Sequence, residues 1–428
     1  MKITAVKHYT VHPGWRKNLI FVKVETDAGV HGWGEAYSQY DRDPAVTAHV
    51  EALGRYIAGH SPFDIRHFTQ IAFDDYAQRR GSVELFCAVS GIEQAMWDIV
   101  GKTCKQPVYN LLGGRCRDKI RVYANGWSYQ MKEPADYARA AEKVIAQGFT
   151  ALKLDPLPAP WRSWIPKEHE ERAVNVVKAV RDAVGPEVDI LIDQHRRLAP
   201  MHAIRLDKRM AEVGLYWMEE SCAAEYPDEL AQIRRETGIP MVIGEATYTK
   251  TGFRPLLEKR AADILNPDVA CVGGILELKE IAAMAETYLV AMSPHNYNST
   301  LVALASTVHA SAVMPNFIIT EYFLPFVEFC DAISPNQLKP KNGYIDLPTA
   351  PGLGVDVDEA ALAKYPGKTY TSRKLRTPEE EPGGICSGRT VRGHRNDKQA
   401  NVSGRRWRRG AGSAAGCVGS QRPGLEAR

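Results

Sequence analysis

The sequence lacks the segments that direct a chain into or across a membrane. No apolar run approaches the ~20 residues that a bilayer-spanning helix needs. The first residues, MKITAVKHYTV, alternate polar and apolar side chains like a strand and lack the charged and apolar regions of a signal peptide. We therefore expect a cytoplasmic protein with no membrane partner.

Paired cysteines and glycine-rich phosphate motifs are also missing. The eight cysteines are scattered along 428 residues and none forms a CxxC pair. This pattern argues against a disulfide framework or a thiolate zinc site, and it indicates reduced thiols. No GxGxxG or GxxxxGKS motif follows any predicted strand, which argues against a nucleotide-binding fold.

The charge is almost balanced, at +3, but it is unevenly distributed. From Pro382 to Arg428, ten Lys or Arg residues face two acids, a net charge of +8, so the rest of the chain carries about −5. The segment 373–428 is rich in Arg, Gly and Ser and has almost no apolar periodicity, so we expect it to be disordered. A nucleic-acid-binding arm is the alternative for this basic tail, and we favour an extension without a function.

The first 118 residues predict a separate α+β unit. Thr4–Val11, Leu19–Thr26 and Val30–Ala36 have the composition of strands, and the Asp-Ala-Gly between the last two is typical of a hairpin turn. Helical periodicity follows at Ala45–Ala58 and Ser82–Lys102.

From residue 119 the pattern becomes regular. Eight short, apolar, β-branched runs alternate with amphipathic helical stretches over ~200 residues, which is typical of a TIM-type (β/α) barrel. An open doubly wound sheet is the alternative. The turn-rich segment 342–357 is expected to end in a short strand. The eight runs are Ile120–Asn125, Ala151–Asp155, Asp189–Asp193, Tyr216–Glu220, Met241–Glu245, Ile264–Asp268, Leu289–Pro294 and Phe317–Glu321.

Ionisable residues end seven consecutive strands of this predicted barrel. The C-terminal ends of the strands in a TIM barrel converge on one mouth, where catalytic groups lie. Three of these residues are carboxylates on consecutive strands, and oxygen ligands without thiols favour Mg²⁺, or Mn²⁺, over zinc. The three carboxylates are Asp193, Glu219 and Glu245, and the other strand-end residues are Lys153, Asp155, His195, Asp268, His295 and Glu321.

Several motifs together carry a family resemblance. They are Gly32-Trp33-Gly34-Glu35, the run SGIEQAMWD from Ser90 to Asp98 with PVYNLLGG from Pro107 to Gly114, Val272-Gly273-Gly274, and Pro351-Gly352-Leu353-Gly354. In this order and spacing they make residues 1–372 resemble the mandelate racemase subgroup of the enolase superfamily. The resemblance implies an α/β fold in which an N-terminal α+β capping domain (1–118) covers a modified TIM barrel (119–323). The segment 324–372 would complete the cap.

The resemblance also assigns roles to the strand-end residues. Asp193, Glu219 and Glu245 match the Mg²⁺ ligands of the family, although Ser221 stands where the family has proline. Asp268 and His295 match its Asp–His dyad, in which a carboxylate orients an imidazole that acts as a base near neutral pH. The step common to the family is removal of the proton α to a carboxylate.

The second catalytic group decides the reaction. Asp155 stands where the racemases of the subgroup have a second lysine base, which argues against racemisation. Asp193-Gln194-His195-Arg196-Arg197 resembles the Asp-x-His-Gly-Arg motif of dehydratases that act on galactonate or gluconate, with Arg196 in place of glycine. The resemblance implies that His295 removes the C2 proton and that His195 protonates the departing 3-hydroxyl.

The remaining site residues would stabilise the intermediate or bind substrate. Lys153 and Glu321 are expected near the enediolate. The expected substrate contacts are Asp155 and Arg197 in the barrel, and Trp15, Lys17, Asn18 and Tyr37 in the cap.

The predicted function is therefore Mg²⁺-dependent dehydration of a sugar acid, an aldonate such as galactonate or gluconate, to a 2-keto-3-deoxy acid. This chemistry makes the protein a hydro-lyase, and we expect it to be a homo-oligomer. An acid-sugar epimerase, racemase or cycloisomerase is the alternative on the same scaffold. A non-catalytic regulatory protein that keeps the fold is the alternative of another class.

Overall fold

The computed structural model describes residues 1–158, 162–371 and 375. Residues 1–371 form one unit. Apart from Leu375, the predicted basic tail at 373–428 lies outside the described residues, as does its expected disorder.

An antiparallel sheet of three strands opens the chain. It consists of β1 (Ile3–Val11), β2 (Leu19–Thr26) and β3 (His31–Ala36), as the alternation predicted. Helix α3 (Val83–Cys104) is buried along most of its length and packs against β3. The approach is close enough that a Cβ on Gly34 would overlap the carbonyl oxygen of Gly91, so the glycine of this motif is required by packing.

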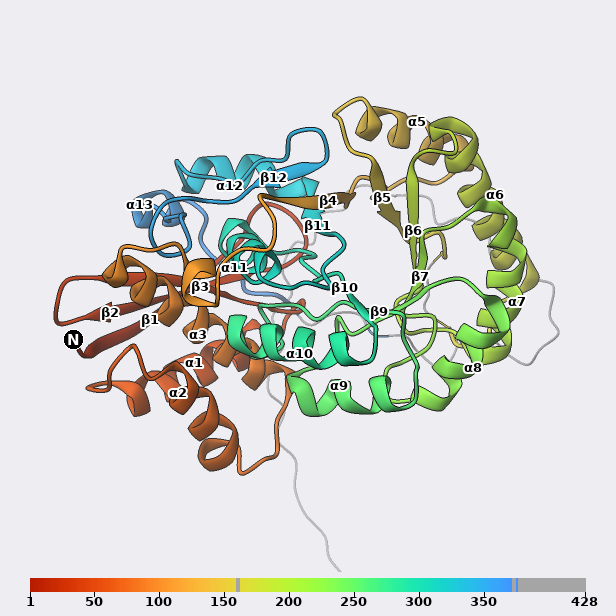
Figure 1. Ribbon diagram of the computed structural model, residues 1–428. Coiled ribbons are helices and arrows are strands. Elements are labelled where there is room, and N and C mark those ends of the chain that lie inside the picture. Colours follow the sequence, from red (N-terminus) through yellow and green to blue (C-terminus); the bar gives the residue numbers. More distant parts are fainter. Residues whose placement is uncertain (159–161, 372–374, 376–428) are drawn as a thin grey trace, which may run out of the picture. The chain divides into compact units, whose positions relative to one another are not determined.

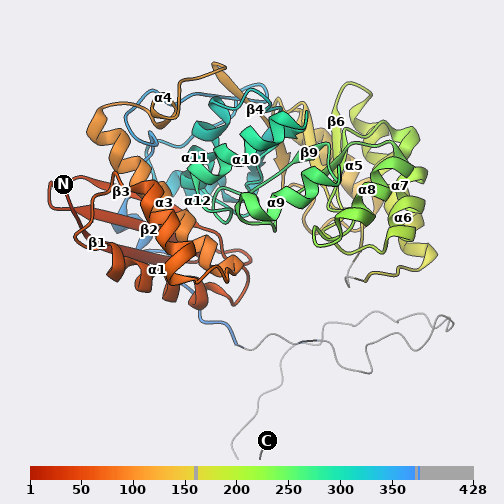
Figure 2. The ribbon, with the colours of Figure 1, turned by 60° about the horizontal axis from the view of Figure 1, so that its bottom comes forward.

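Other helices of this region cover the sheet or lead to the barrel. They are α1 (Asp43–Ile57), α2 (Ile65–Ile71), the π-helical turn η1 (Ala72–Tyr76) and α4 (Val108–Leu111). Figure 2 shows the sheet with α1 and α3 beside α10 (Ile275–Thr287) and α11 (Leu301–Ala312).

Eight parallel strands make the barrel, which confirms the predicted α/β barrel fold (Figure 1). Their hydrogen-bonded order is β10-β9-β8-β7-β6-β5-β4-β11, and a parallel bridge between Met292 and Phe317 joins the two ends of this order. The strands are β4 (Lys119–Asn125), β5 (Ala151–Leu154), β6 (Asp189–Asp193), β7 (Trp217–Glu219), β8 (Met241–Ile243), β9 (Ile264–Leu265), β10 (Ala291–Met292) and β11 (Thr320–Phe323).

Helices alternate with these strands. They are α5 (Pro134–Ile145), α6 (Lys167–Val184), α7 (Pro200–Met210) with the 3₁₀ turn η2 (Ala211–Val213), α8 (Pro227–Thr237), α9 (Thr249–Glu258), α10 and α11. A large hydrophobic core joins the barrel strands to the helices around them.

Several strands are shorter than predicted. Glu245, Asp268 and His295 were expected as the last residues of, or directly after, their strands, but they follow the ends of β8, β9 and β10 by two or three residues. Their backbones stay in register through isolated contacts, because Asp268 and His295 form a parallel bridge of their own.

The segment after the barrel returns to the N-terminal sheet. It contains η3 (Leu324–Phe326), α12 (Val327–Ile333), β12 (Tyr344–Asp346) and α13 (Glu359–Leu362). The prediction that segment 342–357 ends in a strand was wrong, because β12 lies near its start, where it pairs antiparallel with β4. The amide of His12 donates to the carbonyl of Tyr365 at 3.1 Å, and Val11 bridges Pro366. The exact division at residues 118 and 323 stays a prediction.

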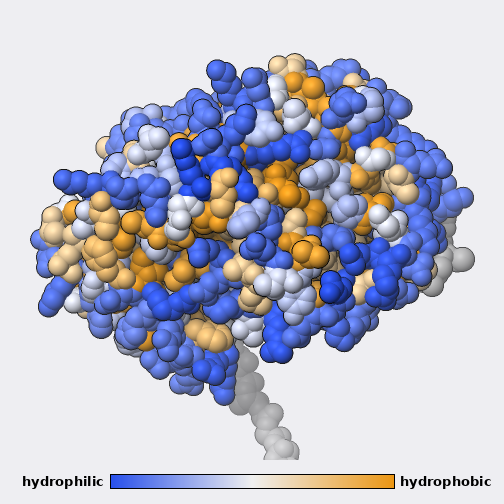
Figure 3. All heavy atoms as spheres, in the orientation of Figure 1, coloured by the Kyte–Doolittle hydropathy of each residue, from blue (hydrophilic) through white to orange (hydrophobic). Residues whose placement is uncertain are grey.

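The visible surface carries both hydrophilic and hydrophobic residues. In Figure 3 the rim of the molecule is largely hydrophilic, and hydrophobic residues are visible mainly in the middle of this face and toward the N-terminal sheet. Within the described ranges, no helix has both the length and the apolar character needed to cross a bilayer.

Candidate active site

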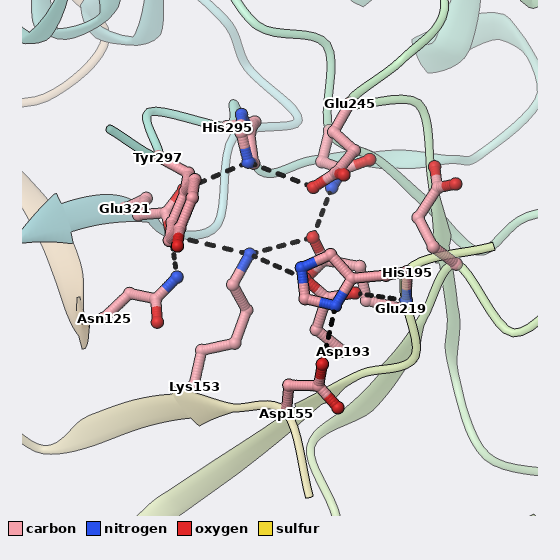
Figure 4. A network of polar contacts seen from close by, with 12 residues as sticks. Asn125, Lys153, Asp155, Asp193, His195, Glu219, Glu245, His295, Tyr297 and Glu321 are labelled. Atoms are coloured by element: carbon pink, nitrogen blue, oxygen red, sulfur yellow. Dashed lines mark hydrogen bonds and ion pairs between the residues drawn. The ribbon is translucent and has the colours of Figure 1, made fainter. Parts of the chain in front are cut away.

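Three carboxylates from consecutive strands meet at the mouth of the barrel. Asp193 ends β6, Glu219 ends β7 and Glu245 follows β8, and one oxygen of each lies within 4.8 Å of the others (Figure 4). Burial raises the pKa of Glu219 to about 8, with repulsion from Asp193 and Glu245 adding to the effect and Lys153 opposing it. A small divalent cation relieves the repulsion between buried carboxylates that lie this close together. The three residues could therefore hold a metal ion together.

Lys153 lies in β5 at the centre of these acids and is 1% exposed. Its Nζ is 2.8 Å from Glu219 Oε1, 3.5 Å from Glu321 Oε1 and 3.8 Å from Asp193 Oδ2. Burial alone would lower the pKa of this amine, but Glu219 and Glu321 hold it well above its usual value. Lys153 is therefore a fixed positive charge beside the carboxylate triad.

His295 and Asp268 form a buried pair. His295 Nδ1 is 2.7 Å from Asp268 Oδ2, and its Nε2 is 3.0 Å from Glu245 Oε2 and 3.6 Å from Glu321 Oε2. Asp268 also accepts the amide of Ala270 at 2.8 Å, which fixes the carboxylate. Burial lowers the pKa of His295, but Glu321 and Glu245 outweigh it and raise the pKa well above the usual value.

His195 lies between two carboxylates. Its Nδ1 is 3.0 Å from Asp155 Oδ2 and its Nε2 is 3.4 Å from Asp193 Oδ2. Arg197, which is buried, donates through Nη2 to Asp155 and through Nε to the carbonyl of Gln194 at 2.9 Å. Burial opposes the charge of His195, but Asp193 and Asp155 raise its pKa to about 9. The two carboxylates therefore favour the protonated form of this imidazole.

Arg196 makes a contact that the sequence did not indicate. Its Nη1 donates to Glu245 Oε1 and lies 3.5 Å from Glu220 Oε2. The residue has a left-handed backbone, with φ of +62°, a conformation that suits glycine or asparagine better than arginine.

The four predicted cap residues have different surroundings. Trp15 lines the mouth and stacks on Phe323 at 5.7 Å between ring centroids. Tyr37 is half-buried. Burial raises its pKa, and the negative charges of Glu245 and Asp268 raise it further. Lys17 is buried and donates to the carbonyl of Ser38 at 2.5 Å, with Nζ 3.6 Å from the ring centre of Tyr37.

Asn18 is not among the residues that line the mouth of the barrel. Its amide donates to Asp43 at 2.9 Å and to the carbonyl of Lys368 at 2.8 Å, and its oxygen accepts the amide of Lys368 at 2.9 Å. This side chain ties the N-terminal sheet to the C-terminal segment, and its expected substrate contact stays a prediction.

Two carboxylates of the N-terminal region hold the helices that follow the Asp268 and His295 loops. Glu35 accepts the amides of Thr300 at 2.9 Å and Ala303 at 3.1 Å, in the first turn of α11. Glu93 accepts the amides of Ile275 at 2.7 Å and Leu276 at 2.9 Å, at the start of α10. Because α11 follows the His295 loop and α10 follows the Asp268 loop, these carboxylates fix both ends of the dyad.

Three polar residues of the site were missed by the sequence reasoning, which searched for ionisable side chains. Asn125 ends β4 and donates to Glu321, and Asn266 donates to Glu219 Oε1 at 2.8 Å. Asn266 precedes Asp268 by two residues, a spacing that signals a shared side of an extended segment. Tyr297, with its ring 6.1 Å from that of His295, carried no comparable signal.

A cavity of about 420 Å³ opens beside these groups. The predicted residues that line it are Trp15, Lys153, Asp155, Asp193 and His195. Arg197 lies behind Asp155, and Lys17 and Tyr37 lie outside the lining.

Comparison with known proteins agrees with this arrangement. Residues 4–113 match the model of the mandelate racemase / muconate lactonizing enzyme N-terminal domain, and residues 136–361 match the enolase C-terminal domain-like model. A curated relative from Variovorax paradoxus, named D-galactonate dehydratase, is 35% identical over 85% of this chain and 94% of its own. The D-gluconate dehydratase of Thermoproteus tenax is 33% identical over 82% of this chain and 70% of its own.

Solved structures of related proteins also superpose on this chain. A member of the enolase superfamily from Salmonella Typhimurium superposes with a TM-score of 0.81 at 29% identity, over 86% of this chain and all of that one. A mandelate racemase/muconate lactonizing enzyme from Jannaschia superposes with a TM-score of 0.81 at 30% identity, over 88% of this chain and 99% of that one. The chain therefore belongs to the enolase superfamily, in the family of mandelate racemase and muconate lactonizing enzyme.

Proposed function

We propose that this protein is a Mg²⁺-dependent hydro-lyase that dehydrates a sugar acid to a 2-keto-3-deoxy acid. Aldonates such as galactonate and gluconate are the first candidate substrates, because curated relatives carry those names. One observation carries the proposal. Two histidines, each paired with its own carboxylate, contact different members of one carboxylate triad, His295 at Glu245 and His195 at Asp193.

Asp193, Glu219 and Glu245 would hold the cation. Bound there, Mg²⁺ would stabilise the negative charge that develops on the substrate carboxylate and would offset the carboxylates that now raise the pKa of His295. Mn²⁺ prefers the same oxygen ligands and is the alternative ion.

The histidines divide the proton transfers. His295, oriented by Asp268, removes the C2 proton, and the resulting enediolate lies near the ammonium of Lys153, with Glu321 fixing that lysine. Asp155 is not a proposed metal ligand and lies 3.0 Å from His195 Nδ1, so it would favour the protonated imidazole when Mg²⁺ is bound, and His195 donates a proton to the departing 3-hydroxyl. The enol that remains tautomerises to the keto acid.

Substrate contacts come from around the same cavity. Asp155 and Trp15 line it and would contact the sugar chain directly. Arg197 would act by holding Asp155 in place. Lys17 and Tyr37 would shape the electrostatics above the dyad, since Lys17 lies over the Tyr37 ring.

A panel of sugar acids, incubated with the protein and Mg²⁺ or Mn²⁺ and scored for keto-acid formation, tests the proposal. We expect at least one aldonate to be converted and His295→Asn to lower the rate by about 10²–10⁴-fold. Full activity in His295→Asn would contradict the assigned base. No turnover of any sugar acid would favour a non-catalytic protein.

An epimerase is the second candidate on this scaffold. It needs a second base on the opposite face of the substrate. The residue at that position is Asp155, directly after β5, and it is engaged by His195 and Arg197. Nuclear magnetic resonance of the product in D₂O separates the two reactions, because an epimerase keeps all carbon–oxygen bonds.

A further inference from the structure

The outer part of the active-site cavity has a different chemistry from the inner part. Next to the carboxylate triad the cavity is lined by Lys153, Asp193 and His195. The lining farther along comes from the β1–β2 loop, the segment after β4, helix α6 and the loop after β10, and it contains several aromatic and basic side chains. Its members include Trp15, Arg16, Tyr129, Arg172 and Tyr297.

Arg16 is held in place by aromatic rings. Its Nη1 donates to the hydroxyl of Tyr297, and its guanidinium carbon lies 5.2 Å from the ring centre of Trp15, 5.9 Å from that of Tyr129 and 5.5 Å from that of Tyr297. Among the described residues, no carboxylate lies within ion-pair distance of Arg16. The backbone of Arg16 is left-handed, with φ of +57°, which is costly for a residue other than glycine. These contacts orient the cation and leave its charge uncompensated.

Arg172 adds a second positive charge to the same cavity. Its side chain donates to two backbone carbonyls, of Pro156 at 3.2 Å and of Lys132 at 2.6 Å. Both acceptors are neutral, and the described part of the chain offers this guanidinium no ion-pair partner either. Two arginines from distant parts of the chain thus face one cavity without an acid to balance them.

The acids that line this cavity are engaged elsewhere. Asp193 belongs to the triad and contacts His195, and Asp155 is shared by His195 and Arg197. The outer part of the cavity therefore keeps a net positive charge. Tyr297 separates the two parts, because its ring lies 6.1 Å from His295 while its hydroxyl accepts from Arg16.

We propose that Arg16, supported by the charge of Arg172, binds a second anionic group at the far end of the sugar acid. A planar guanidinium with free N–H groups is suited to bind a carboxylate or a phosphate in a bidentate manner. The enzyme would then prefer sugar acids whose terminal carbon carries a carboxylate or a phosphate over plain aldonates of the same configuration. This inference rests on the proposed dehydration of sugar acids and names the substrate class within it.

The test uses matched substrates and two variants. The kcat/KM for keto-acid formation is measured for an aldonate, for the diacid of the same configuration and for the 6-phosphorylated aldonate. Wild-type protein should prefer the diacid or the phosphorylated acid, and the arm that shows the preference identifies the anion. Arg16→Met keeps the apolar stem against the rings and should lower this preference by about 10- to 100-fold, mainly through KM. Arg16→Lys should keep part of it.

Arg139→Met is the matched control, because Arg139 is exposed and pairs with Asp136 on α5. The inference is overturned when the wild-type protein prefers the plain aldonate, or when Arg16→Met lowers kcat/KM equally for all three acids. If no sugar acid is dehydrated, the proposed function fails by itself. Calorimetric titration of the same three acids then decides the inference, because the anionic acids should bind more tightly than the aldonate in wild-type protein and not in Arg16→Met.

Discussion

Replacing Arg196 with glycine is expected to tighten Mg²⁺ binding. Both oxygens of Glu245 are occupied in the structure, since Oε1 accepts from Arg196 and Oε2 lies 3.0 Å from His295 Nε2. A cation that uses Glu245 must displace or share one of these contacts. The guanidinium also repels any cation held by the triad.

The size of the effect follows from the contact. A hydrogen bond between two charged groups contributes about 1.5–3 kcal/mol, and the Arg196 side chain is 25% exposed, so we expect the lower end of this range. About 1.4 kcal/mol corresponds to a tenfold change in affinity, so Arg196→Gly should bind Mg²⁺ about tenfold more tightly. Glycine accepts the left-handed backbone at this position without strain, so the variant should fold.

Isothermal titration calorimetry of Mg²⁺ into metal-free protein measures this directly. Arg196→Asn is a second variant, because asparagine tolerates the left-handed region and cannot form the ion pair. Arg139→Asn removes an exposed ion pair of α5 and should leave the dissociation constant unchanged. Equal or weaker Mg²⁺ binding by both Arg196 variants would refute the reasoning.

Two further predictions concern stability. Burial lowers the pKa of His309 to about 4, below the ~6.5 expected in the unfolded chain, so protonation favours unfolding. The contribution of neutral His309 to the free energy of unfolding is complete above pH ~6.5 and is lost toward pH 4, about 3 kcal/mol in all. In urea unfolding at several pH values, His309→Gln should weaken the dependence of the free energy of unfolding on pH. The same pH dependence in both proteins would contradict this prediction. Lys153→Met leaves Glu219 and Glu321 without their buried cation and should destabilise the metal-free protein by about 3–5 kcal/mol. Added Mg²⁺ should restore part of this loss in thermal unfolding. An unchanged melting temperature of the metal-free variant would contradict the prediction.

The fold could be predicted from the sequence because two regular patterns dominate the sequence. The β-branched runs that became β4 to β11 alternate with amphipathic helices, and this alternation has few solutions. Asp193 ends its strand as predicted, Glu219 ends β7 one residue before the predicted end, and parallel strands bring such ends together. The same pattern could not place β12, because its pairing with β4 depends on a contact between distant segments.

The details of the site were less accessible, because they depend on which partner a side chain meets. Asn18 follows a loop that faces the cavity, yet its amide bonds to Asp43 and Lys368. Arg196 differs from the dehydratase motif by one residue, and only the fold places its guanidinium on Glu245. The oligomeric state stays a prediction.

The division of labour between the two histidines is the central claim, and hydrogen exchange in D₂O tests it most directly. His195→Gln protein, with Mg²⁺ and a sugar acid that the wild-type protein converts, should still replace the C2 proton with deuterium. Its keto-acid formation should fall by about 10²–10⁴-fold, whereas His295→Asn should lose both reactions. Dehydration by His195→Gln at the wild-type rate, or loss of exchange while His295 is intact, would contradict the account.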